Sequence, residues 1–193
     1  MLLLDDKLVL EALARLGAGI AASSSHVRVV VAGGVAGLLG GLLSGNRTTG
    51  DVDVLWAGSD EEWRTIERAA AVVAADLSLP ARWFNRDCSQ FAWCLPLEWE
   101  SRCVHAGTFG RLDVWRIARV DLLAAKLISA PKRPQDLLDI QEIAPTREEI
   151  AFLHEHLDRL ESEHLGGETF ERQRQILDAI VRPVERDGER GDV

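Results

Sequence analysis

The sequence feature that most constrains the fold of this chain is an apolar run that ends in two glycines. Two closely spaced aspartates follow it. Residues 27–32 are rich in β-branched side chains, which favours a strand, and Gly33 and Gly34 follow directly. Asp51 and Asp53 then flank a single valine in a second apolar stretch. Because successive side chains of a strand point to opposite faces, both carboxylates would project from one face. The pattern predicts two paired strands with an acidic pair on the second.

The acidic pair and the glycines together indicate metal and phosphate chemistry. Two carboxylates on one face repel each other, so a divalent cation is their natural partner. Glycines between a strand and a short helix allow backbone N–H groups to approach a phosphate closely. Nucleotidyl transfer depends mainly on positioning and charge neutralisation, and two metal ions need more than two carboxylates. Asp113, between two apolar residues of a predicted strand, is the expected third ligand for Mg²⁺ or Mn²⁺.

The composition narrows the classes of function. A chain of 193 residues with 47% hydrophobic content is long enough for one domain and a helical appendage. Its net charge of -9 argues against tight nonspecific DNA binding but leaves RNA open as a substrate. The three cysteines lack the spacing of a zinc site or a disulfide framework. No export signal or membrane-spanning stretch is apparent, so we expect a cytoplasmic protein with no membrane partner.

Apolar periodicity, capping boxes and prolines predict the secondary structure. Strands are expected over residues 27–32, 51–56 and 110–117, and helices over 6–22, 35–43, 59–76, 121–129, 136–143, 146–161 and 169–182. Residues 77–91 are expected to form a loop, and residues 93–104 favour no single structure. The predicted organisation is one domain over residues 1–145, a C-terminal helical appendage over 146–182 and a disordered tail over 183–193.

These motifs resemble the signature of the polymerase-β-like nucleotidyltransferase superfamily. The matching elements are Gly33-Gly34, Arg47-x-Thr49-x-Asp51-Val52-Asp53 and the later acid Asp113. Within that superfamily the chain is most similar to minimal bacterial nucleotidyltransferases that include toxins of the AbiEii type, whose lysine-bearing helix corresponds here to DLLAAKLISAPKRPQDLLDI. The resemblance covers about residues 25–145. It implies an α+β fold, in which a mixed sheet packs against helices, with extra C-terminal helices in this chain.

The resemblance also implies roles for individual residues. Asp51, Asp53 and Asp113 are expected to bind the metal and to be catalytic. Asp113 could also activate the acceptor hydroxyl. The residues expected to contact the nucleotide are Gly33, Gly34, Arg47, Thr49 and Lys126, with a role in holding the strand of the two aspartates in place as the alternative for Arg47 and Thr49. Gly34 stands where many members have serine, which removes one hydroxyl contact to phosphate but agrees with the toxin-like branch. The alternative for Lys126 is a lysine that faces solvent. The alternative for the nearby polar residues Arg133, Asp136 and Asp139 is that they form i,i+3 side-chain pairs and helix caps.

We therefore expect a Mg²⁺-dependent nucleotidyltransferase that moves a nucleotidyl group from an NTP to a hydroxyl of RNA, protein or a small molecule. One alternative is the toxin of a toxin–antitoxin pair, which would act on tRNA or use GTP and bind an antitoxin. Others are a non-catalytic nucleotide-binding module and a structural α+β domain with coincidental motifs. Trp115 is the one tryptophan expected to contact a ligand, and His154 and His156 are expected at the surface.

Overall fold

The computed structural model describes residues 3–20, 26–163 and 169–188, which form two compact units, Met1–Leu122 and Leu123–Val193. The protein belongs to the α+β class, with a five-stranded mixed sheet in the first unit. The first unit contains α1 (Asp6–Gly19), β1 (Val27–Val31), α2 (Gly33–Leu39), β2 (Val52–Ala57), α3 (Asp60–Leu77), β3 (Phe84–Asn85), the 3-10 helix η1 (Asp87–Cys94), α4 (Trp99–Arg102), β4 (Val104–Phe109) and β5 (Leu112–Arg116). Helix α5 (Arg119–Ser129) crosses the division, and the second unit continues with α6 (Pro134–Ile143), α7 (Arg147–Ser162) and α8 (Glu171–Gly188).

The strands follow the order β3-β2-β1-β5-β4, so the predicted first strand lies at the centre of the sheet. Strand β1 pairs antiparallel with β2 and parallel with β5. The short strand β3 extends the sheet beyond β2 in parallel, and β4 closes the other edge antiparallel to β5. The predicted pairing of the first two strands is therefore confirmed.

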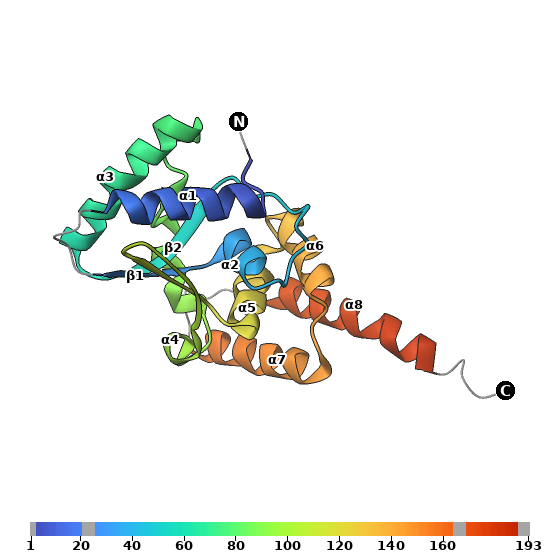
Figure 1. Ribbon diagram of the computed structural model, residues 1–193. Helices are drawn as coiled ribbons and strands as arrows, with labels where there is room; N and C mark the ends of the chain where they lie inside the picture. Colours follow the sequence, from blue (N-terminus) through green and yellow to red (C-terminus); the bar gives the residue numbers. More distant parts are fainter. Residues whose placement is uncertain (1–2, 21–25, 164–168, 189–193) are drawn as a thin grey trace. The chain divides into compact units, whose positions relative to one another are not determined.

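Helices α1 and α3 pack against each other and against the sheet in the first unit (Figure 1). Asp5 caps α1 by accepting a hydrogen bond from the backbone N–H of Leu8. Ser59 and Glu62 form the predicted capping box at the start of α3. The apolar faces of both helices and of the central strands are buried, as the apolar periodicity predicts.

Helix α1 approaches the turn between β4 and β5 so closely that only glycine fits at Gly17. A Cβ atom at this position would overlap the backbone carbonyl oxygen of Phe109. We expect Gly17→Ala to destabilise the protein by about 2 kcal/mol, since overpacking against backbone outweighs the better helix propensity of alanine. Gly19→Ala is the matched control, because its Cβ would meet only Ala69 at an ordinary 3.5 Å. Thermal unfolding of both variants measures the difference, and an equal melting temperature would contradict this packing.

The second unit is helical. Thr146 and Glu149 form the second predicted capping box, at the start of α7. Its buried apolar side chains come from α5, α6, α7 and α8 and from the segment before α8, and they include Leu123, Leu127, Ile140, Ile143, Ile150, Leu153, Leu157, Leu160, Phe170 and Leu177. Helix α8 continues to Gly188, beyond the expected end at Arg182, and the last five residues of the predicted tail lie outside the described residues. The division at Leu122 also falls earlier in the chain than the predicted boundary at residue 145.

Three local expectations were wrong. The segment expected to be a loop contains β3 and η1, which form because the chain there reaches the edge of β2. Helix α5 begins at Arg119, two residues before the expected start at Asp121. The buried carboxylate of Asp121 accepts hydrogen bonds from Nε and Nη2 of Arg102 at 3.2 and 2.6 Å. His156 is buried on the apolar face of α7 instead of lying at the surface.

No helix in the described parts of the chain has the length and apolar character needed to cross a membrane.

Candidate functional site

The two aspartates lie at the start of β2, beside the end of β1. Asp51 directly precedes the strand and Asp53 is its second residue. The backbone N–H of Ala32 donates to the carbonyl oxygen of Asp53 at 2.9 Å. Asp53 therefore lies beside the junction between β1 and α2. Val52 between them is fully buried, whereas both aspartates are half-buried. The predicted alternation is therefore confirmed, and both carboxylates stay accessible.

The two glycines bring the backbone of α2 against this acidic strand. Gly33 has a φ of +62°, and a Cβ there would lie 2.7 Å from Oδ2 of Asp53. A Cβ at Gly34 would lie 3.1 Å from Oγ1 of Thr49. The absence of side chains therefore lets a carboxylate and a hydroxyl approach the first residues of α2, whose N–H groups have no acceptor within the helix.

The loop before β2 places Arg47 and Thr49 in the same cluster. Thr49 donates its hydroxyl to the carbonyl oxygen of Asp51 at 3.1 Å, and its backbone forms a two-way bridge with Leu4. The guanidinium of Arg47 donates to the carbonyl oxygen of Thr48, and its Nη2 lies 3.9 Å from a Cβ built at Gly34. The structure thus gathers six predicted residues at one end of β1: Gly33, Gly34, Arg47, Thr49, Asp51 and Asp53.

Two residues that the sequence did not indicate also lie at this site. Asn85 in β3 pairs in register with Asp53, and its side-chain amide donates to Oδ2 of Asp51 at 3.2 Å. Cys88 lies in the following 3-10 helix. Burial raises the pKa of the Cys88 thiol to about 12, and the negative charges of Asp53 and Asp51 act in the same direction. This environment favours the protonated thiol at neutral pH.

Asp113 lies at the opposite end of β1. Asp113 pairs in register with Arg28 of β1, whereas Asp53 is hydrogen-bonded to Ala32, four residues further along the chain. The two aspartates are therefore about 13 Å apart along the strand direction, and β1 lies between their strands. Its carboxylate accepts a hydrogen bond from the Thr108 hydroxyl at 2.7 Å and lies 3.5 Å from Nδ1 of His26. The structure therefore does not bring Asp113 to the acidic pair.

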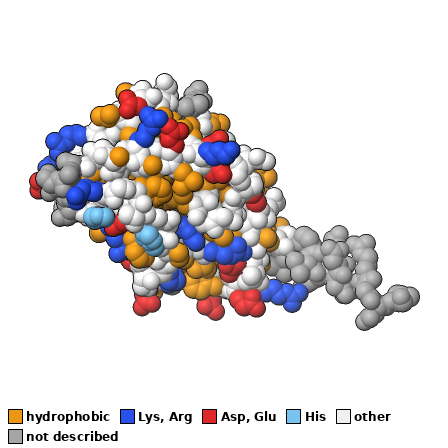
Figure 2. Space-filling view, in the orientation of Figure 1, with side chains coloured by type: hydrophobic (Ala, Val, Ile, Leu, Met, Phe, Trp, Pro, Cys, Tyr) orange, Lys and Arg blue, Asp and Glu red, His pale blue; other side chains and the backbone are white. Residues whose placement is uncertain are grey.

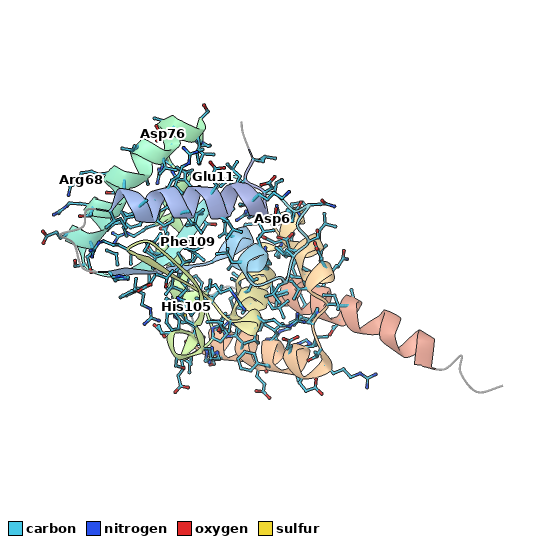
Figure 3. All side chains as sticks on the ribbon, in the orientation of Figure 1. Asp6, Glu11, Arg68, Asp76, His105 and Phe109 are labelled. Atoms are coloured by element: carbon cyan, nitrogen blue, oxygen red, sulfur yellow. The ribbon has the colours of Figure 1, made fainter. Side chains whose placement is uncertain are left out.

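A group of aromatic and basic side chains surrounds Trp115 on the same sheet face as Asp113. The guanidinium carbon of Arg28 lies 4.2 Å from the centre of the Trp115 ring and 5.9 Å from that of Trp56. His105, on β4 in Figure 3, meets Trp115 edge-on at 5.3 Å. Trp115 therefore packs against Arg28 and His105, and the ligand contact expected of it stays a prediction.

Lys126 belongs to a buried network in the second unit. Its ammonium group donates to Asp136 at 3.1 Å and to Asp139 at 2.5 Å, and all three side chains are almost completely buried. Ser129 donates to the second oxygen of Asp136, and Gln135 donates to the second oxygen of Asp139. The geometry favours a role for this lysine in holding α5 to α6, and its expected nucleotide contact stays a prediction.

The side chains near the acidic pair supply only part of the ligand set that a metal ion needs. Acidic and basic side chains are interspersed on the face in Figure 2. In the described ranges, no three His, Cys, Asp or Glu side chains are arranged to hold a metal ion. Any cation at the acidic pair would therefore need further ligands from substrate and water.

Comparisons with protein-family models, with curated proteins and with solved structures each found no match.

Proposed function

We propose that this protein is a metal-dependent nucleotidyltransferase that uses Asp51 and Asp53 to bind Mg²⁺ together with an NTP. The observation that supports this most is the close approach of the Asp53 carboxylate to the glycine backbone at the start of α2. A carboxylate suits a hard cation and helical N–H groups suit phosphate, and a metal–triphosphate complex requires both.

The donor set fits Mg²⁺ bound together with its substrate. Mg²⁺ prefers oxygen ligands and is usually held by one or two carboxylates, with phosphate oxygens and water completing its shell. Asp51 and Asp53 supply two carboxylates, and Arg47 adds a positive charge in the same cluster. Because Asp113 lies at the other end of β1, we assign one ion to the acidic pair rather than two ions to three acids.

In the proposed reaction, an acceptor hydroxyl attacks the α-phosphorus of the NTP. The new bond joins the acceptor oxygen to that phosphorus, the bond from phosphorus to the β-phosphate oxygen breaks, and pyrophosphate leaves with its electron pair. Asp51 and Asp53 would hold a cation, which would balance the charge on the phosphates, and a carboxylate of this pair would accept the hydroxyl proton. The residues of the cluster therefore serve mainly to position groups and to neutralise charge.

The experiment compares two labels on the same nucleotide. Purified protein is incubated with Mg²⁺, total RNA and protein, and each NTP labelled at either the α- or the γ-phosphate. Nucleotidyl transfer predicts that the α-label, but not the γ-label, becomes attached to an acceptor, and that chelation of Mg²⁺ prevents it. Transfer of the γ-label would indicate a kinase instead. Binding of NTP without transfer of either label would indicate the non-catalytic module.

A further inference from the structure

We propose that Asn85 is a positioning residue for the metal site, which fixes one oxygen of Asp51 so that the other faces the cation. This inference rests on the proposed function, because it assumes that Asp51 is a metal ligand. Asn85 is buried, although asparagine is a residue type found mostly at the surface, and it is one of only two asparagines in the chain. A buried amide at this place needs its hydrogen bonds satisfied, and its partners show what it orients.

The hydrogen bonds of Asn85 determine the direction of its amide. The backbone N–H of Asp87 donates to a side-chain oxygen at 2.8 Å, so the atom facing it must be Oδ1. The NH₂ group therefore faces the other way, where it lies 3.2 Å from Oδ2 of Asp51 and 3.3 Å from the carbonyl oxygen of Arg82. An amide flip would set donor against donor at Asp87, so Asn85 offers a donor to Asp51.

The backbone that carries Asn85 is firmly anchored. Trp83, two residues earlier, is fully buried and donates its indole N–H to the carbonyl oxygen of Ala70 in α3 at 3.0 Å. The carbonyl oxygen of Trp83 in turn accepts the backbone N–H of Val52, which lies between the two aspartates. Phe84 stacks on Trp63 with the ring centres 6.0 Å apart. The position of the amide is thus set by the core of the first unit.

A neutral donor suits this role better than a cation would. An arginine or lysine in place of Asn85 would offset the charge of Asp51 and weaken its attraction for Mg²⁺, whereas an amide orients the carboxylate and leaves its full negative charge. Groups that orient metal ligands in this way typically change metal affinity by about ten- to a hundredfold when they are removed.

The test measures Mn²⁺ binding by electron paramagnetic resonance in the presence of a nonhydrolysable NTP. The variant is Asn85→Ser, whose hydroxyl can still accept the N–H of Asp87 but is too short to reach Asp51. Asn46→Ser, at the exposed second asparagine, is the matched control. We expect Asn85→Ser to weaken Mn²⁺ binding about tenfold, Asn46→Ser to leave it unchanged, and Asn85→Ser to have no further effect when added to Asp51→Ala.

The outcomes separate this inference from the proposed function. Equal Mn²⁺ affinity in wild type and Asn85→Ser would overturn the inference and leave the metal site standing. So would a tenfold loss that persists unchanged in the Asp51→Ala background, since Asn85 would then act through the general stability of β3. Absence of Mn²⁺ binding to the wild type would overturn the proposed function and this inference together.

Discussion

Replacement of Asp53 by asparagine is expected to reduce the rate of nucleotidyl transfer by about a hundredfold or more. The change removes one of the two proposed metal-ligating carboxylates, and the lost charge stabilisation amounts to several kcal/mol in the transition state. The fold should persist, because asparagine has the same shape and the backbone bond from Ala32 to residue 53 does not involve the side chain. The measurement is the initial rate of α-label transfer at saturating NTP.

Asp76→Asn is the matched control for this variant. Asp76 is an exposed residue near the end of α3, and Figure 3 shows it at the tip of that helix. The same chemical change there should leave the transfer rate within about twofold, since surface substitutions away from a site have small effects. If Asp53→Asn and Asp76→Asn both retained the wild-type rate, the acidic pair would not be the catalytic centre.

Lys126→Met is expected to destabilise the second unit by about 3–5 kcal/mol. The substitution keeps the length of the side chain but leaves the buried carboxylates of Asp136 and Asp139 without their shared ammonium group. Uncompensated buried charge is among the most costly changes in a protein interior. Urea denaturation of wild type and variant measures the difference in the free energy of unfolding.

Lys132→Met removes a nearby exposed lysine and should change the free energy of unfolding by less than about 0.5 kcal/mol. Addition of Asp139→Asn to Lys126→Met should recover part of the lost stability, because one of the two buried charges is then removed as well. A stable Lys126→Met variant that loses only NTP affinity would instead support the nucleotide contact implied by the family resemblance.

Features that depend on local sequence could be predicted well. The capping boxes of α3 and α7 need only residues three positions apart, and both are present. The glycine pair and the aspartates were also assigned to the right elements, because each set lies at the end of a short strand with a clear apolar pattern. Their meeting at one end of β1 follows from the antiparallel pairing of two neighbouring strands.

Features that depend on register and distant pairing could not be predicted from the sequence. Asp113 shares a sheet face with the acidic pair, but the parallel register of β5 with β1 sets it at the other end. Asn85 is 34 residues from Asp51, and it reaches the site through a two-residue strand that has no pattern of its own. The partners of Lys126 also depend on tertiary packing. A lysine on an amphipathic helix usually faces solvent, and the packing of α6 against α5 buries this one.

The most direct test of the acidic pair is a titration with Mn²⁺ in the presence of a nonhydrolysable NTP. The proposed site predicts saturable binding of Mn²⁺ by the wild type and an affinity at least about tenfold lower when Asp51 and Asp53 are both replaced by asparagine. Wild-type affinity in that double variant, or no binding to the wild type at all, would contradict it.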